Sequence, residues 1–378
     1  MVFVASLSAV LSPRHASPTA VRRSGQRRKV RTEEVAVARS KGVTIRDVAQ
    51  RAGVSIAAVS MALNGTGTLS AATRLRVRAV AEEMEYEADA LARGLRRSSV
   101  GAIGLVMRSL DALGEYAPRG VDVFTRYIGA ASAQAMDRGL SVMLVPDPTK
   151  RPTPPLALSL DGYIVTMPHR DDPVIDLLER RGIPYVTLGR DPSRPDFTDW
   201  ATEDDGSSFR RIYEHFAASG ARSIALLRGT DPNAWNIDSE ATYRAWCESA
   251  GITPRVYMSA ERTGEHGGEN IAHAIVDDGI PDAILCHTGR QAAGVLAGLT
   301  ARGVAVPERT MLAAASDSEH TRHSRPAISA VELHAAETTM ALLDLLQARI
   351  AGEPSAGPVL TTARFRVRAS SRRTDPNA

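Results

Sequence analysis

The sequence predicts a two-part protein, with a small all-α unit near the N-terminus and a larger α/β core built on two parallel sheets. Its 378 residues exceed one ordinary domain, for which about 150 residues is a reasonable prior. Residues 43–97 carry helix-start signals and glycine turns, whereas residues from 99 onward alternate short apolar runs with amphipathic stretches. A hydrophobic content of 43% and a charged content of 24% are typical of a folded globular chain and exclude wholesale disorder.

The charge is unevenly distributed along the chain. Residues 1–99 hold 17 Lys and Arg against 8 Asp and Glu, a net of +9, and the remainder holds 29 against 35, a net of −6. This asymmetry indicates that the front of the chain contacts a polyanion, although a basic tail that binds nothing specific fits the same numbers. We expect residues 1–41 to be a disordered basic extension, because no helix or strand period persists there.

Several protein classes lack their signatures. No apolar run reaches the 18 residues of a membrane-spanning helix, and no basic residue precedes the mildly apolar start, so we expect a cytoplasmic protein without a membrane partner. Cys247 and Cys286 are too few for a disulfide framework, and Cys286 lies in an apolar run typical of a core. No metal-ligand spacing, dinucleotide fingerprint, phosphate loop or nucleophile elbow is present. We therefore expect no metal, no cofactor and no enzymatic activity.

Residues 42–87 predict a small helical domain. Thr44–Asp47 has the pattern of a capping box, which starts a first helix with an inward-facing Val48-Ala49 pair. Gly53 then allows a tight turn, and Ser55 is a good N-cap for a second helix over residues 56–63.

A third helix begins at Ser70. Apolar residues expected to face inward recur along it at helical spacing: Leu75, Val77, Val80, Ala81 and Met84. Two helices joined by a tight glycine turn, with a third in support, are typical of a helix-turn-helix, whose second helix can enter the major groove of DNA. By periodicity alone, any small three-helix bundle fits as well.

The residues themselves decide between these alternatives. The run Val43-Thr44-Ile45-Arg46-Asp47-Val48-Ala49-Gln50-Arg51-Ala52-Gly53-Val54-Ser55 closely resembles the start of lac-repressor/galactose-repressor (LacI/GalR) family regulators. The likeness continues at Val59-Ser60, Leu63-Asn64-Gly65, Ser70, Thr73-Arg74, Val77, Tyr86 and Ala92-Arg93-Gly94-Leu95. It implies a repressor-type transcriptional regulator that binds double-stranded operator DNA as a homodimer. The alternative, an α/β solute-binding protein or enzyme without DNA binding, has no need of this N-terminal motif.

The resemblance also implies which residues contact DNA. They are Thr44, Arg46, Ser55, Ile56, Ala57, Ser60, Met61, Asn64, Ala92 and Leu95. Ile56, Ala57 and Met61 occupy the base-reading face, where the family usually has a polar residue in the first turn and an Arg in place of Met61. Residues 88–98 resemble the family's hinge helix, in which Leu95 stands where a leucine wedges into the minor groove.

From residue 99 onward, strands and helices alternate, which predicts parallel sheets covered by helices. We expect strands over residues 100–107, 140–145, 162–166, 184–188, 223–227, 256–258 and 283–286. We expect helices over residues 121–138, 173–181, 207–219, 242–250, 267–277 and 291–302. The resemblance makes residues 99–371 a periplasmic-binding-protein-like core of two subdomains around an effector cleft, followed by a tail over 372–378. It also implies that the helix over 121–138 supplies much of the dimer contact.

The cleft departs from the sugar-binding members of the family. Aligned with them, Ser239 stands where they use an arginine and Gly289 where they use an aspartate. The loss of both removes a charge-assisted clamp for vicinal hydroxyls. The candidate effector-binding residues are Thr166, Asp205, Trp235, Asn236, Ser239 and Gly289. We expect either a small-molecule effector that is not a typical hexose or a regulator that has lost small-molecule control.

Overall fold

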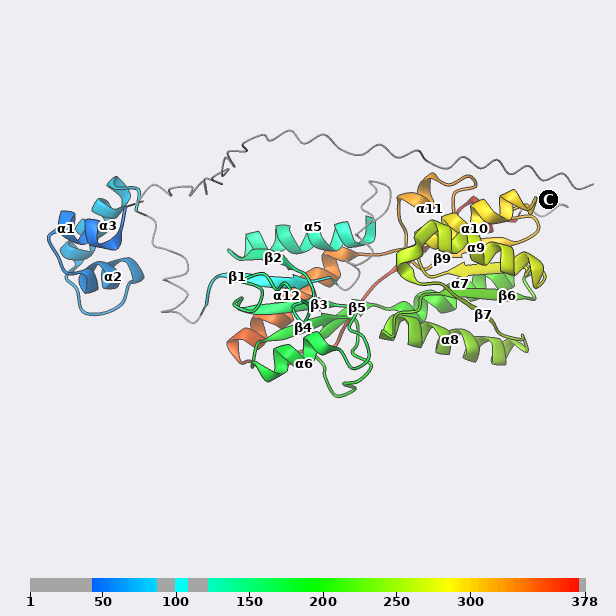
Figure 1. Cartoon of the computed structure of the whole chain (residues 1–378), viewed down its shortest axis with the longest axis horizontal. Helices are drawn as coiled ribbons and strands as arrows, with labels where there is room; N and C mark the ends of the chain where they lie inside the picture. The colour runs from blue at the N-terminus through cyan, green and yellow to red at the C-terminus, as the bar shows by residue number, and fades with distance from the viewer. Residues whose placement is uncertain (1–42, 87–98, 108–121, 374–378) are drawn as a thin grey trace, which may run out of the picture. The chain divides into compact units, whose positions relative to one another are not determined.

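The computed structural model describes residues 43–86, 99–107 and 122–373. The chain divides into two compact units, Met1–Glu87 and Ala88–Ala378 (Figure 1). The predicted basic extension and hinge helix, with Ala92 and Leu95, lie outside the described residues. No helix within the described part of the chain is long and apolar enough to cross a membrane.

The N-terminal unit is the predicted set of three helices, α1 (Ile45–Ala52), α2 (Ile56–Asn64) and α3 (Ala71–Glu83). The capping box at the start of α1 is confirmed, because the Thr44 backbone N–H donates to Asp47 Oδ2 over 2.8 Å. Gly53 ends α1 with a φ of 62°, in the left-handed region that glycine adopts without strain. These local features fix the tight turn between α1 and α2.

The core of this unit consists of small apolar side chains: Val48, Ala49, Ala52, Val59, Ala62, Val77 and Ala81. The prediction for Leu75 was wrong, because its side chain is 69% exposed. Leu75 precedes Val77 by two positions, which is about 200° around a helix, so the two residues cannot face the same core.

The C-terminal unit contains two sheets of six strands each. The first has the order β11-β5-β4-β3-β1-β2 and the second β12-β10-β9-β8-β6-β7. The strands of the first are β1 (Ala102–Val106), β2 (Ser141–Val145), β3 (Gly162–Thr166), β4 (Tyr185–Leu188), β5 (Trp200–Glu203) and β11 (Val359–Thr361). Those of the second are β6 (Ile224–Arg228), β7 (Arg255–Met258), β8 (Ala283–Cys286), β9 (Met311–Ala314), β10 (Ser329–Glu332) and β12 (Arg364–Arg366). Neighbouring strands pair in parallel except β10 and β12, which confirms the predicted fold class.

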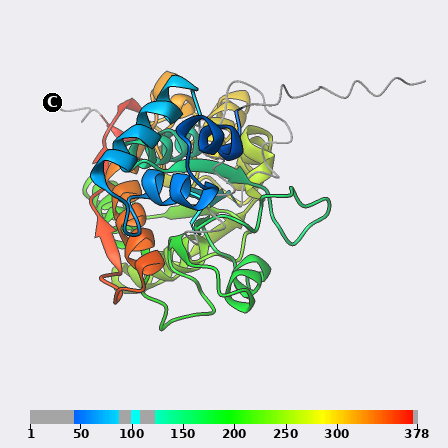
Figure 2. The same cartoon turned by 90° about the vertical axis from the view of Figure 1, so that its left-hand side faces the viewer.

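Helices cover both faces of each sheet (Figures 1 and 2). The first sheet packs against α5 (Asp122–Asp137) and α12 (Ala335–Ala351) on one face and α6 (Pro173–Arg180) on the other. The second sheet packs against α7 (Asp205–Ala218) and α8 (Ala234–Ala250) on one face, and α9 (Gly264–Asp277) and α10 (Gly289–Ala301) on the other. A short α11 (Glu319–His323) packs near α10. Two-sided burial explains why strands such as β8 are apolar throughout.

One predicted helix boundary was wrong in a way that affects function. The helix expected over 242–250 begins eight residues earlier, at Ala234. Asn233 caps it, because its side chain accepts a hydrogen bond from the Asn236 backbone N–H over 2.9 Å. The extra turns carry Trp235, Asp238 and Ser239 on a rigid helix.

The chain passes between the two halves of this unit at three places: from β5 to α7, from β10 to α12, and from β11 to β12. We call the half around the first sheet the first lobe and the other half the second lobe. Hydrogen bonds tie the crossings together. The Asp204 N–H donates to the Thr361 carbonyl over 2.9 Å, and Thr338 Oγ1 lies 2.9 Å from Glu203 Oε1 and 2.7 Å from Thr361 Oγ1. The crossings therefore form one hydrogen-bonded junction.

The pairing of α9 with α10 depends on glycine. A Cβ atom built at Gly294 would clash with the backbone oxygen of Glu265, which cannot move without displacing α9. We expect Gly294→Ala to lower the free energy of unfolding by about 1–3 kcal/mol, measured by chemical denaturation.

Gly129 offers a matched control, since it is an exposed glycine within α5 and has nothing within 4 Å of a built Cβ. Gly129→Ala should be neutral or stabilise the protein by up to about 1 kcal/mol. Equal effects of the two substitutions would contradict the close-packing account.

Candidate functional site

The predicted DNA-reading residues of α2 share one face of the helix. Ile56, Ala57, Ser60, Met61 and Asn64 fall within an arc of about 140° at 100° per residue. Val59 and Ala62 point the opposite way, into the core of the N-terminal unit. Ile56 is 41% exposed and Ala57 is also exposed, whereas the other three are half-buried. The face is therefore apolar where α2 begins and polar toward its end.

Met61 does not project freely from this face. A Cβ atom built at Gly67 would clash with Met61 Sδ, so the thioether lies against the loop that joins α2 to α3. Arg74 steadies the same loop, because its Nη2 donates to the Gly67 carbonyl over 3.3 Å. Met61 thus fills space beside the loop and presents no hydrogen-bond donor.

The remaining polar residues flank the two helix starts. Thr44 Oγ1 donates to Asp47 Oδ2 over 2.7 Å, and hydrogen bonds from Thr44 lower the pKa of the Asp47 carboxyl. Ser55 Oγ accepts from the Ala58 N–H over 3.1 Å. Asn64 Nδ2 donates to Ser60 Oγ over 3.3 Å, and Arg46 is exposed on α1. Both helix starts present N–H groups, a favourable environment for phosphate.

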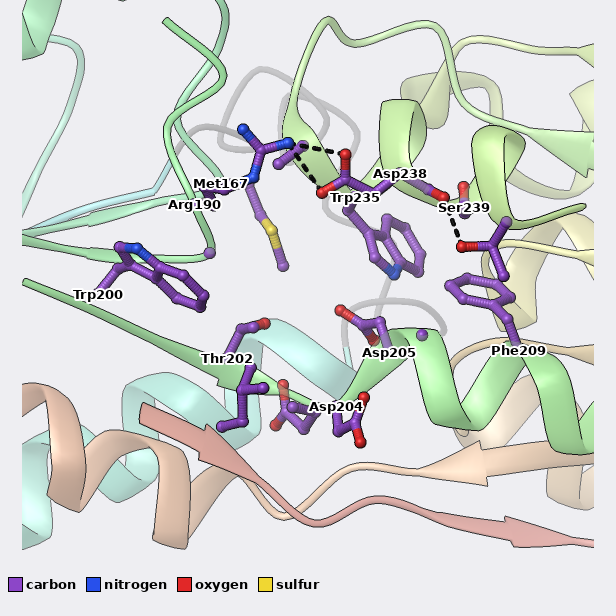
Figure 3. Close-up of a pocket in the computed structure, with 16 residues that line it drawn as sticks. Met167, Arg190, Trp200, Thr202, Asp204, Asp205, Phe209, Trp235, Asp238 and Ser239 are labelled. Carbon is purple, nitrogen blue, oxygen red and sulfur yellow. Dashed lines mark hydrogen bonds and ion pairs between the residues drawn. The ribbon is translucent and has the colours of Figure 1, made fainter. Parts of the chain in front are cut away.

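A cavity of about 250 Å³ lies between the two lobes of the C-terminal unit. Its lining includes Met167, Gly189, Arg190, Trp200, Thr202, Glu203 and Leu360 of the first lobe and Asp205, Gly206, Phe209, Ala234, Trp235, Asp238, Ser239 and Thr242 of the second, with Asp204 at the crossing. Figure 3 shows the indole rings of Trp200 and Trp235 on opposite sides of the cavity, with Asp205 below them. Aromatic walls and clustered carboxyl groups thus meet in one pocket.

Three consecutive carboxyl groups stand where β5 passes into α7. Glu203 is buried and accepts hydrogen bonds from Tyr127 and Thr338. Asp204 caps α7 by accepting from the Ser207 N–H over 3.1 Å, and hydrogen bonds from Ser207 hold its pKa below the usual value. Asp205 caps no helix, and its hydrogen-bond donor is the Trp235 side chain.

Asp205 is the most perturbed of these groups. Burial raises its pKa well above that of an ordinary carboxyl, and the neighbouring charges of Glu203, Asp204 and Asp238 raise it further. The Trp235 side chain opposes this by hydrogen-bonding to the carboxyl. Folding therefore favours the protonated form of Asp205 more than that of an ordinary carboxyl.

A buried polar network fixes Trp235. Its ring packs on the His287 imidazole, with 4.5 Å between ring centroids. Asn236 Nδ2 donates to Glu261 Oε1 over 2.6 Å, which leaves Asn236 Oδ1 to accept from His287 Nδ1 at 2.8 Å. His287 Nε2 then accepts from the Ser239 hydroxyl, 2.8 Å away. Burial lowers the pKa of His287 to about 3, so the ring stays neutral at physiological pH.

The pocket brings together only part of the predicted effector set. Asp205, Trp235 and Ser239 line it. Asn236 lies behind the wall and supports it. Thr166 is buried, with its hydroxyl donating to the Val106 carbonyl over 3.2 Å, and Gly289 packs beside Ser318 at the start of α10. Neither is among the lining residues.

Sequence reasoning missed most of the lining residues, among them Trp200, Glu203 and Arg190. Trp200 and Glu203 come from β5, a strand too short to be predicted, and Arg190 follows β4. Glu203 is the last residue of β5 and Arg190 lies two residues after β4, so a position at a strand end is their one sequence signal. Trp200 begins β5 and lacks that signal. Among the described residues, no group of three or more His, Cys, Asp or Glu is placed to hold a metal ion.

An ion pair crosses the pocket between the lobes. Arg190 Nη2 of the first lobe donates to both carboxylate oxygens of Asp238 on α8, over 2.7 and 3.0 Å (Figure 3). Nearby, the Arg170 N–H donates to the Pro232 carbonyl over 2.8 Å. The lobes are therefore linked directly beside the pocket.

Asp205 and Asp204 should affect stability with opposite signs. Since the pKa of Asp205 is raised by folding, its contribution is fully present below the unfolded carboxyl pKa and is lost as pH rises through the folded value. Asp205→Asn stays neutral and should raise the melting temperature over wild type at pH 8, with the difference vanishing at acidic pH.

Asp204→Asn is the matched control. Its pKa is lowered, so the charged form stabilises the fold above the unfolded pKa and this is lost as pH falls. The substitution should lower the melting temperature at pH 8. Thermal unfolding of the two variants across pH tests both signs, and shifts in the same direction would refute the assignment.

Family models match both units of the chain. Residues 44–89 match the model of bacterial regulatory proteins of the lacI family, and residues 213–371 match that of a periplasmic binding protein-like domain. Among curated relatives, the HTH-type transcriptional regulator AscG of Escherichia coli K12 is 26% identical over 312 residues, covering 80% of this chain and 90% of its own. The HTH-type transcriptional repressor PurR of Erwinia tasmaniensis is 26% identical over 297 residues, covering 76% and 84% respectively.

Solved structures show the same architecture. A lac repressor dimer bound to operator and the anti-inducer ONPF superposes with a TM-score of 0.73 at 22% identity, covering 88% of this chain and 99% of that one. The transcriptional regulator CelR in its cellobiose complex gives a TM-score of 0.64 at 22% identity, covering 87% and 99%. The chain therefore carries a LacI-family helix-turn-helix domain followed by a periplasmic binding protein-like domain, and its relatives are LacI-type transcriptional regulators.

Proposed function

We propose that this protein is a repressor that binds operator DNA as a homodimer through α2, under the control of a small molecule in the cleft. The observation that carries the DNA-binding part is the single exposed face of α2, on which the base-reading candidates lie together. A homodimer places one headpiece on each half-site of a pseudo-palindromic operator. DNA binding and the bacterial relatives support a location in the cytoplasm. They also support a role in binding rather than in catalysis.

The composition of the α2 face predicts an unusual operator preference. Ile56 and Ala57 can contact thymine methyl groups, while Met61 cannot make the bidentate contact to guanine that an arginine makes. Each such contact is worth about 1–3 kcal/mol of discrimination between bases. The preference should therefore shift away from guanine at the base pair opposite Met61.

Selection of operators from random DNA tests this proposal. The wild-type chain should return half-sites without a required guanine at that position, and Met61→Arg should restore the guanine. Gly67 lies beside the Met61 side chain and the φ of Gly67 is 68°, so this glycine should be left unchanged in the variant. A wild-type consensus that keeps the guanine would contradict the assignment of Met61 to the base-reading face.

Control by a ligand follows from the position of the pocket. Its walls come from both lobes, so a molecule bound there contacts groups whose separation changes when the lobes rotate. A ligand shifts such an equilibrium by its difference in affinity for the two arrangements. The alternative, a regulator that has lost small-molecule control, is disfavoured by the preorganised Trp235 wall. Genomic mapping of binding sites with and without candidate effectors would distinguish the two.

A further inference from the structure

We propose that the effector is an organic cation, with its ammonium group bound between the indole rings of Trp200 and Trp235 beside the Asp205 carboxyl. This inference rests on the proposed function of the cleft as the effector site, and it names the chemical class of the ligand. Three features of the pocket carry it: the balance of charge, the facing aromatic rings, and the state of Asp205.

The lining is strongly acidic. Among the described residues that line the cavity, Glu203, Asp204, Asp205 and Asp238 stand against one cationic side chain, Arg190. Arg190 already donates to both oxygens of Asp238, and an ion pair of this kind leaves little positive potential for a ligand. A phosphate or carboxylate ligand would therefore enter a negative field without a cation to receive it, whereas an ammonium group is attracted by the same field.

The aromatic walls are suited to a cation. Figure 3 shows Trp200 and Trp235 facing the cavity from opposite sides. Tryptophan is the strongest aromatic partner for a cation, and the attraction grows when the site excludes water. Trp235 is held in place by the His287 ring behind it and by the network through Ser239 and Asn236. The wall is thus preorganised, which limits the ordering cost of binding.

Asp205 is the anionic partner that such a ligand requires. The charges facing it are those of Glu203, Asp204 and Asp238, and the Trp235 side chain is its hydrogen-bond donor. Arg190 across the pocket is engaged with Asp238. An arriving ammonium group stabilises the ionised carboxylate, so binding lowers the pKa of Asp205 and favours release of its proton. A neutral sugar can stack on the same rings but gains nothing from this charge.

Calorimetry on the full-length protein tests the inference with two matched pairs of probes. Choline is compared with 3,3-dimethyl-1-butanol, its neutral isostere, and glucosamine with glucose. Each cation should bind at least tenfold more tightly than its neutral partner. Because choline keeps its charge at every pH, its affinity should rise with pH as Asp205 ionises, while that of the neutral isostere stays constant.

Two variants test whether Asp205 is responsible for the cation preference and its pH dependence. Asp205→Asn should weaken choline binding at least tenfold and abolish its pH dependence. Glu214→Gln is the control, since Glu214 is an exposed carboxylate on the same helix and its loss removes the same charge. That variant should bind like wild type. The pH series on wild type needs no variant, so the test survives if Asp205→Asn fails to fold.

Two results would overturn the inference: equal or tighter binding of both neutral partners, or no saturable binding of either cation in the millimolar range. Failure of the proposed function gives a different result. If glucose binds at least as tightly as glucosamine and changes operator affinity, the cation preference is wrong and ligand control stands. If the protein binds no operator in footprinting assays, the proposed function fails whatever the ligand preference.

Discussion

The crowding of Glu203, Asp204 and Asp205 where β5 passes into α7 is the constraint on which the C-terminal unit depends. Three carboxyl groups in sequence repel one another when ionised, and each must find its own support. Glu203 is held by Tyr127 of α5 and Thr338 of α12, which ties it to both helices on one face of the first sheet. Asp204 caps α7 and so begins the second lobe. Asp205 is left to face the cavity.

Residues 203–205 therefore connect the two lobes, cap α7 and line the pocket. A ligand that alters the charge of Asp205 acts within one residue of the junction that joins the lobes. Thr338 and Thr361 connect that junction to the other two crossings. A change in the charge of Asp205 can therefore bias the relative orientation of the two lobes. Ligand binding and DNA binding would both depend on this orientation.

The sequence predicted the architecture well because its signals are local. Capping residues, glycine turns and apolar runs define α1, α2 and most strands without tertiary information. The failures have physical causes. Leu75 matched an apolar spacing but lies on the wrong side of α3, and β5 was missed because four residues with alternating burial carry little periodicity. The start of α8 was missed because an Asn cap within a polar stretch is a weak signal.

The pocket was harder to predict than the headpiece. Its residues come from separate loops and strand ends, so Trp200 and Arg190 could be placed beside Trp235 only by the fold. Three predicted effector-binding residues, Thr166, Asn236 and Gly289, are not among the lining residues, because alignment to a family transfers position but not side-chain chemistry. His287 carried no functional signal in the sequence, and its role as the support of Trp235 depends on a buried network.

The central claim is that the state of the cleft is communicated to DNA binding. Its most direct test is the operator affinity of Arg190→Met, which breaks the ion pair across the pocket without touching the headpiece. A partly exposed pair is worth about 0.2–1 kcal/mol, so the account predicts a change in operator Kd of about 1.4-fold to fivefold. Affinity for nonspecific DNA should stay constant. An operator Kd identical to that of wild type would contradict the account.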